Sequence, residues 1–137
     1  MSNKTLLHRT DMEVRWGDMD AVGHVNNTLY FRYFEQCRVS WLAEIGSIES
    51  VTTARQGPVI INTSASFLRP LHYPVRIVVS MFGNAPGRSS FESEFEIRDA
   101  DNADILYSTG SAKIVWIDKD ANKSIPLPDS IRALLPA

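Results

Sequence analysis

Polar residues of several chemical types gather in one short stretch, GDMDAVGHVNN, which runs from Gly17 to Asn27. The stretch lies between a strand-like segment and a helix-like segment. The first amides of a helix have no intrahelical partner and carry about half a positive charge, so they can hold a developing oxyanion. A carboxylate such as Asp20, upstream of these amides, could activate water or attack a carbonyl. Together the two groups would form a site for acyl hydrolysis.

Turn chemistry alone also explains such a loop, because Asp, Asn and Gly are frequent in turns and at helix N-caps. For each residue taken singly, the structural interpretation therefore stays open beside the catalytic one. It is the combination of a carboxylate with a helix N-terminus that favours chemistry at this point in the chain.

The segments on either side of the loop have contrasting periodicities. Met12–Trp16 alternates apolar and charged residues, which predicts a half-buried strand. From Asn27 to Ile45, apolar residues recur every three or four positions and predict a helix that is apolar over most of its surface. Asn26 or Asn27 can cap this helix, and Gly46 can end it. A helix of this kind should form the centre of the core.

Four further strands are predicted from alternating or β-branched runs. They cover Pro58–Leu68, Val75–Phe82, Phe91–Arg98 and Ile105–Ile117, and a short helix is predicted over Ser130–Leu135. In the first of these strands, the residues expected to share one face are Val59, Ile61, Thr63, Ala65 and Phe67.

Short connections between the strands predict an antiparallel sheet, since parallel crossovers need longer links. The expected fold class is α+β, with a curved five-stranded sheet wrapped around one long central helix in a single domain over residues 1–137. Such a sheet leaves free edges, and pairing with a second copy of the chain would cover them.

Composition narrows the classes of partner. The chain has 14 basic and 16 acidic residues, a net charge of -2, and therefore no general positive field for nucleic acid. The single cysteine, Cys37, has no disulfide partner, which indicates a reducing compartment and predicts a cytoplasmic location. We recognise no signal peptide in the sequence. No uninterrupted apolar run approaches the ~20 residues that a membrane span needs.

The stretch VRWGDMDAVGHVNNTLYFRYFEQCR, from Val14 to Arg38, resembles the motif of hotdog-fold thioesterases of the 4-hydroxybenzoyl-CoA thioesterase type. SASFLRPLHYPV, GRSSFESEFEI and STGSAKIVWID resemble later strands of the same family, so the likeness covers most of the chain. The resemblance implies the hotdog fold and hydrolysis of an acyl-CoA to free acid and CoA, with no metal and no cofactor. It also implies at least a homodimer, and it leaves open whether dimers pair further into a homotetramer.

The same resemblance assigns roles to individual residues. The catalytic carboxylate falls on Asp20, as nucleophile or general base, and the amide that polarises the thioester carbonyl is the backbone N–H of Asn27. Gly23 matches the loop glycine, and Tyr30 matches a tyrosine at the helix entry that could equally be core. Asp18 matches the first acidic position, which we interpret as loop structure.

The HVNN portion also resembles plant-type acyl-carrier-protein thioesterases, in which an asparagine and a histidine follow the catalytic aspartate at fixed spacing. His24 fits the histidine position and Val22 does not fit the asparagine position, so a complete Asp-Asn-His relay is not expected. His24 could orient the loop, contact the thioester or hydrogen-bond the backbone.

Phosphates of coenzyme A would need donors near the site. The turn residues Arg88, Ser89 and Ser90 offer a guanidinium and hydroxyls, and Arg69 offers a second cation, although each could be a solvated turn residue. The resemblance places nucleotide contacts on this side of the fold without assigning them to these residues.

Other residues are weaker candidates for catalysis. Cys37 lies on the apolar stripe and is interpreted as packing, while Glu35 is the reserve carboxylate and could pair with Arg38. The sequence contains no G-x-S-x-G elbow, Walker loop or Cys/His cluster, which argues against serine hydrolases, nucleotide hydrolysis and zinc chemistry. A non-catalytic acyl-CoA binder, an acyl-carrier-protein thioesterase and a hydratase remain as alternatives.

Overall fold

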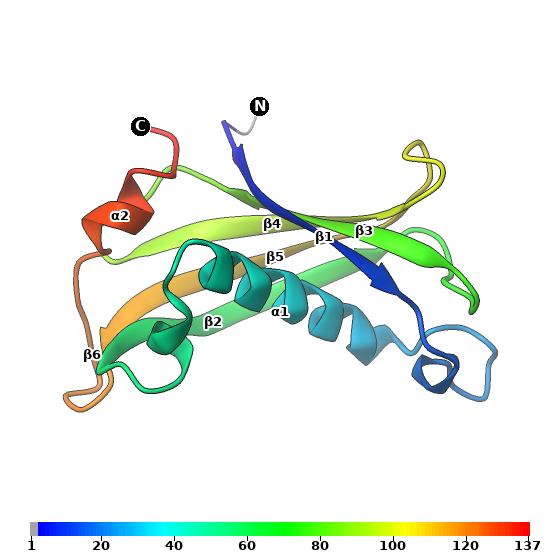
Figure 1. Cartoon of the computed structure of the whole chain (residues 1–137), viewed down its shortest axis with the longest axis horizontal. Helices are drawn as coiled ribbons and strands as arrows, with labels where there is room; N and C mark the ends of the chain where they lie inside the picture. The colour runs from blue at the N-terminus through cyan, green and yellow to red at the C-terminus, as the bar shows by residue number, and fades with distance from the viewer. Residues whose placement is uncertain (1–2) are drawn as a thin grey trace.

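One curved antiparallel sheet folds around one long helix in the computed structural model, which describes residues 3–137 (Figure 1). The strands are β1 (Thr5–Glu13), β2 (Gln56–Phe67), β3 (Arg76–Gly83), β4 (Ser90–Asp99), β5 (Leu106–Asp118) and the two-residue β6 (Lys123–Ser124). The helices are α1 (Asn27–Glu44), α2 (Asp129–Arg132) and the short 3-10 turns η1 (Trp16–Asp18) and η2 (Ile48–Val51). The strand order is β1-β3-β4-β5-β2, and β6 pairs with β5. The predicted α+β class is confirmed, with five long strands.

Sequence periodicity placed most elements well. The helix starts at Asn27 as predicted, and four of the five long strands differ from their predicted bounds by one or two residues. The predicted C-terminal helix exists as the single turn α2. No helix among residues 3–137 is long and apolar enough to cross a membrane.

The first strand is the main exception, because the strand predicted over Met12–Trp16 lies too far along the chain. β1 ends at Glu13, and Trp16 starts η1 with 73% of its surface exposed. Val14 is still buried, and its N–H donates to the Val75 carbonyl at 3.0 Å, but the chain then turns away from the sheet. Most of β1 is polar because it is an edge strand, so its sequence lacks a strong apolar pattern.

The strand β2 contains a β-bulge at Ile61, so the prediction that Val59 and Ile61 share a face with Thr63, Ala65 and Phe67 is wrong. Ile60 and Asn62 pair with adjacent residues of β5, and this leaves Ile61 as the extra residue. Ile60 pairs with the buried Ile114, so Ile60 and not Val59 shares the inner face before the bulge. Past the bulge, Thr63, Ala65 and Phe67 share one face of the strand, as predicted.

α1 packs its apolar side into the concave face of the sheet (Figure 1). Phe34 stacks on Phe95 of β4 with ring centroids 4.8 Å apart, and Trp41 meets Phe91 edge to face at 6.2 Å. The helix ends where Gly46 adopts a φ of 77°, a left-handed conformation that favours glycine. The predicted central helix is therefore anchored along its length by aromatic contacts.

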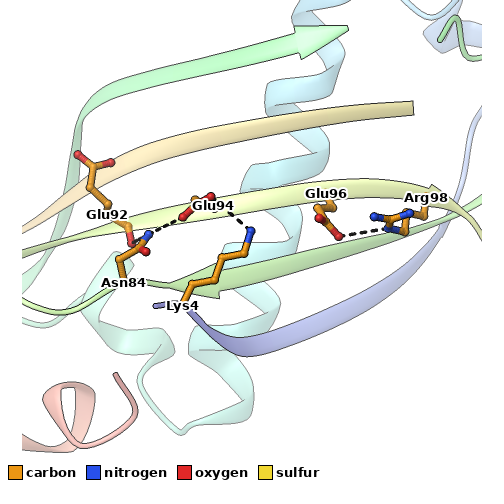
Figure 2. Close-up of polar contacts among 6 residues, drawn as sticks. All are labelled: Lys4, Asn84, Glu92, Glu94, Glu96 and Arg98. Carbon is orange, nitrogen blue, oxygen red and sulfur yellow. Dashed lines mark hydrogen bonds and ion pairs between the residues drawn. The ribbon is translucent and has the colours of Figure 1, made fainter. Parts of the chain in front are cut away.

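The outer face of the sheet is polar, as the alternation of β4 predicts. Figure 2 shows the charged side chains of β4 on the side of the sheet away from α1. Glu94 accepts from Asn84 Nδ2 at 2.8 Å and lies 3.4 Å from Lys4 Nζ, while Arg98 Nε donates to Glu96 at 3.2 Å. Ion pairs that stay partly exposed at the surface, like these, usually add little stability, so the sheet depends mainly on its inner face.

The packing of Gly110 gives a first prediction. A Cβ at this position would overlap Phe34 Cε2 and lie 2.7 Å from Phe34 Cζ, and the Phe34 ring is buried and stacked on Phe95, which restricts its movement. Gly110→Ala should therefore lower the free energy of unfolding by about 1–3 kcal/mol in urea titrations. Gly87→Ala, where the nearest atoms are 3.6 Å away, is the control and should stay within about 1 kcal/mol of the parent. Equal stabilities of the two variants would contradict this description of the core.

The thiol of Cys37 gives a second prediction. Cys37 is fully buried, its Sγ lies 3.5 Å from the Val79 carbonyl, and burial raises its pKa from 9.0 to about 11. Iodoacetamide at about pH 8 should alkylate the folded protein at least ~100-fold more slowly than the urea-unfolded protein, because the thiolate is scarce and shielded. Rapid alkylation of the folded state, followed by mass spectrometry, would show instead that Cys37 is a reactive thiol.

Candidate active site

The polar loop forms a tight hairpin that leads into α1. The N–H of Asp20 donates to the His24 carbonyl, and the N–H of Gly23 donates to the Asp20 carbonyl, both at 3.0 Å. Gly23 has a φ of 89°, so the glycine at this position satisfies a backbone requirement. The turn holds the backbone of Asp20 close to the start of the helix.

Both carboxylate oxygens of Asp20 accept hydrogen bonds, although the residue is exposed. Oδ1 accepts from the N–H of Val22 at 2.9 Å, and Oδ2 accepts from Asn26 Nδ2 at 3.1 Å. Asn26 is the N-cap of α1, since its Oδ1 accepts from the N–H of Thr28 at 3.0 Å. Of the two predicted caps, the structure selects Asn26, and this same side chain contacts Asp20.

The first amide of α1 is available to a ligand. The N–H groups of Thr28 and Leu29 donate to the side chain and the carbonyl of Asn26, respectively. Among residues 3–137, the backbone N–H of Asn27 has no hydrogen-bond acceptor, and Asn27 is exposed. A free N–H at a helix N-terminus can stabilise an oxyanion. The arrangement thus places a carboxylate and an electrophilic amide at one helix end.

Asp18 ties the loop to the body of the helix. Its Oδ2 accepts from the Tyr33 hydroxyl at 2.7 Å and from the N–H of Arg15 at 3.1 Å, and its carbonyl accepts from the N–H of Asn26 at 3.1 Å. Burial, followed by the contact with Asp18, raises the pKa of Tyr33, so the phenol stays protonated and remains a donor. These contacts fit the interpretation of Asp18 as loop structure.

A small cleft opens beside the N-terminus of α1, on the side of β2. We call it the β2-side cleft; its volume is about 180 Å³, and its lining is His24, Val25, Asn27, Tyr30, Phe67, Leu68, Arg69 and Pro70. Three of the predicted site residues, His24, Asn27 and Arg69, therefore meet in one place. Phe67 contacts Tyr30 edge to face at 4.8 Å, and burial raises the pKa of the Tyr30 phenol.

A second histidine supports the loop. The ring of His72 lies edge to face against His24 with centroids 5.0 Å apart, and its Nδ1 is 3.0 Å from the Gly23 carbonyl. Because a carbonyl only accepts, this Nδ1 carries the proton and donates. His72 was not predicted as a site residue. The direction of β2, which delivers the RPLHYP turn to the start of α1, could have indicated it.

The Asp20 carboxylate lies outside both hollows near the helix start. The larger hollow, of about 700 Å³, lies on the β1 side of α1 and includes Asp18 and Tyr33 in its lining, but not Asp20. The β2-side cleft also lacks Asp20 in its lining. In one chain, Asp20 is exposed to solvent and lines neither of these two pockets.

Arg88, Ser89 and Ser90 lie at the other end of α1. Their turn packs near α2, where Arg132 Nη2 donates to the Arg88 carbonyl at 2.9 Å, and the adjacent β4 residue Phe91 contacts Trp41. Asn27 and Trp41 are separated by about 21 Å along the helix axis. The four residues predicted to bind CoA are therefore not brought together in one chain, since only Arg69 is near His24 and Asn27.

The weaker candidates do not gather into a second site. Glu35 pairs with Arg32 at 3.5 Å, and the pairing with Arg38 that the sequence suggested is not found among the described residues. Burial lowers the pKa of Arg38. No group of three or more His, Cys, Asp or Glu side chains within residues 3–137 is arranged to hold a metal ion.

Comparisons with known proteins identify the family. Residues 14–135 match the thioesterase-like superfamily. The structure of the PA2801 protein from Pseudomonas aeruginosa, described as a candidate thioesterase, is 40% identical with a TM-score of 0.89 and covers 94% of this chain and 98% of its own. A candidate acyl-CoA thioesterase from Xanthomonas campestris is 39% identical, with a TM-score of 0.75, over 83% of this chain and 95% of its own.

A curated plant protein is also similar. The chloroplastic acyl-acyl carrier protein thioesterase ATL3 of Arabidopsis thaliana is 29% identical over 130 residues, which are 93% of this chain. The chain spans 66% of the length of that relative, just under two thirds. The resemblance seen in the sequence and the hotdog architecture are thus confirmed. The chain belongs to the thioesterase-like superfamily, a family of thioester hydrolases.

Proposed function

We propose that this protein hydrolyses acyl-CoA thioesters to a carboxylic acid and free CoA. The observation that supports this most directly is the pairing at the start of α1. The carboxylate of Asp20 is hydrogen-bonded to the N-cap of the helix whose first amide, at Asn27, has no acceptor among the described residues. A base or nucleophile and an oxyanion donor are the two groups that acyl transfer requires.

In this mechanism the thioester carbonyl oxygen lies against the N–H of Asn27. Asp20 either removes a proton from water as the water attacks, or attacks the carbonyl and forms an anhydride that water then opens. In both routes the C–S bond breaks, the thiolate of CoA takes up a proton, and the acyl group leaves as the acid. One oxyanion donor contributes about 3 kcal/mol to the transition state, so the backbone at Asn27 matters as much as the side chains.

The acyl group would lie in the β2-side cleft, whose walls include Tyr30 and Phe67. Because Asp20 faces solvent in one chain, we propose that a second copy closes the site and that the protein is at least a homodimer. β2 is a free edge of the sheet, and Ile61 on it is 59% exposed. An apolar free edge is a site for strand pairing.

Arg69 is the cation best placed to meet a CoA phosphate near this cleft. The role predicted for Arg88, Ser89 and Ser90 stays a prediction. It requires CoA to extend along the length of α1, or the turn to come from the second copy. A cytoplasmic location also stays a proposal, supported by the single cysteine, Cys37, which is buried and has no disulfide partner.

An acyl-carrier-protein thioester is the second candidate substrate, favoured by the similarity to the Arabidopsis protein. A binder without catalysis is the remaining alternative. Release of free thiol from acetyl-, hexanoyl-, palmitoyl- and benzoyl-CoA, compared with hexanoyl-acyl carrier protein, separates these cases in one assay. Calorimetric binding of hexanoyl-CoA without thiol release would identify a binder and refute the hydrolase.

Replacement of the proposed base is the central test. Asp20→Asn keeps the size of the side chain and removes its charge, so kcat for thiol release should fall by about 10³-fold or more. The matched control is Asp18→Asn, which removes the same charge two residues away. Because Asp18 holds the loop through Tyr33, this variant should lower the Tm and keep kcat within about tenfold of the parent.

Two results would contradict this assignment. A folded Asp20→Asn protein with the parental kcat would exclude Asp20 as base or nucleophile. A large loss of kcat in Asp18→Asn, with none in Asp20→Asn, would transfer the role to the first aspartate. Circular dichroism of both variants establishes that they are folded.

The proposed dimer gives a further prediction. Ile61→Glu places a charge on the β2 edge and should convert the protein to a monomer in analytical ultracentrifugation, with loss of activity. Leu6→Glu is the matched control, because Leu6 is a 40% exposed residue on β1, the opposite edge of the sheet. It should leave the assembly intact. A dimer that survives Ile61→Glu and dissociates in Leu6→Glu would assign the interface to β1.

A further inference from the structure

The side chain of Asn26 bonds to two functionally different groups at once. Its Oδ1 accepts from the N–H of Thr28 at 3.0 Å and from the Thr28 hydroxyl at 2.6 Å. Its Nδ2 donates to Asp20 Oδ2 at 3.1 Å. One amide group therefore joins the first turn of α1 to the candidate catalytic carboxylate.

The orientation of this amide is determined by its neighbours. The N–H of Thr28 can only donate, so the oxygen of Asn26 must face it. A flipped amide would direct its oxygen at the Asp20 carboxylate and its NH2 at the N–H of Thr28, which would lose both hydrogen bonds. Formation of the helix cap thus aims an N–H donor at Asp20.

The carboxylate of Asp20 is held from two directions. The N–H of Val22 binds Oδ1, and Asn26 binds Oδ2. A single hydrogen bond would leave the carboxylate free to rotate about the remaining bond, whereas donors on both oxygens define its plane. An ionised carboxylate has about four lone-pair positions, so about two remain, which can accept a proton from water or attack the carbon of a substrate carbonyl.

We propose that Asn26 is a positioning residue, which aims the Asp20 carboxylate at the reacting carbonyl by anchoring it to the N-cap of α1. The inference rests on the function proposed above. Asn26 acts through Asp20 and does not itself contact the thioester. The amide oxygen of the same side chain accepts from the N–H of Thr28. The N–H of Asn27 is left without an acceptor among the described residues. The position of the carboxylate is thereby set relative to the oxyanion donor.

Two substitutions separate positioning from capping. Ser and Asp are N-caps as good as Asn, so Asn26→Ser and Asn26→Asp should both keep the helix start. Neither can donate from the Nδ2 position to Asp20. Displacement of a catalytic group by about 1 Å can cost about 100-fold in rate. We therefore expect kcat for hexanoyl-CoA to fall about 10- to 100-fold, with KM within about threefold and a Tm close to the parent.

The pH profile adds a readout of the contact between the side chain at position 26 and Asp20, which is separate from helix capping. Asn26→Asp places a second carboxyl group beside Asp20. Repulsion between two adjacent carboxylates raises the pKa at which the second of them ionises. The acidic limb of kcat/KM should move upward by about one pH unit or more relative to Asn26→Ser. The nearby titratable groups, Asp18 and His24 on the loop and His72 on the facing turn, are the same in both variants.

Thr28→Ala is the control for the cap. It removes the hydroxyl bond to Asn26 Oδ1 and leaves the bond between Asn26 and Asp20 intact, so kcat should stay within about twofold of the parent. The double variant Asp20→Asn/Asn26→Ser should be no slower than Asp20→Asn alone, because Asn26 acts only through that carboxylate.

Each result supports or overturns the proposal. The proposal would be overturned by a parental kcat in Asn26→Ser, or by an acidic limb of the kcat/KM profile that stays unchanged in Asn26→Asp. Asn26 would then be only the N-cap of α1. If Asn26→Ser does not fold, the isosteric Asn26→Asp carries the test, with the same expected loss of kcat. A parental kcat in Asp20→Asn would instead refute the proposed function, and that outcome is read from Asp20→Asn alone.

Discussion

The junction between the polar loop and the first turn of α1 depends on the bridge from Thr28 through Asn26 to Asp20. A helix must satisfy its first amides in some way, and here the residue that does so also donates to a carboxylate. The same side chain therefore caps the helix and holds the carboxylate that we propose to be catalytic. A change at Asn26 is therefore expected to affect local stability and the proposed chemistry together, whereas a replacement that can still cap should affect the chemistry alone.

The bridge is useful only because both of its ends are fixed. α1 is held in the concave face of the sheet by aromatic packing, with Phe34 stacked on Phe95. The loop is held to the helix by Asp18 and Tyr33, and the carbonyl of Gly23 is held by His72 from the turn after β2. Separate elements thus fix the backbone on which Asp20 stands. Rigid support of this kind is what a catalytic group needs for precise placement.

The sequence predicts contacts between residues that are close together in the chain better than contacts between residues that are far apart in it. The pairing of Asp20 with the start of α1 is local, and it was expected from the order of residues and from the family motif. The bulge at Ile61 was missed because alternation assumes an unbroken strand, and β1 was misplaced because an edge strand need not be apolar. His72 and Arg69 lie near the site because β2 ends beside the start of α1, and that direction follows from the sheet order and not from residue type.

The open side of the site connects the fold to the proposed assembly. β2 is both one of the two edge strands of the sheet and, through Phe67 near its end, a wall of the cleft beside Asn27. A second chain that paired along this edge would bring its own residues close to a carboxylate that now faces solvent. Dimerisation would then exclude water from the oxyanion donor and strengthen its electrostatic effect, since interactions are larger where solvent is displaced. On this argument, a monomeric variant should lose activity even when its loop, cap and helix remain folded.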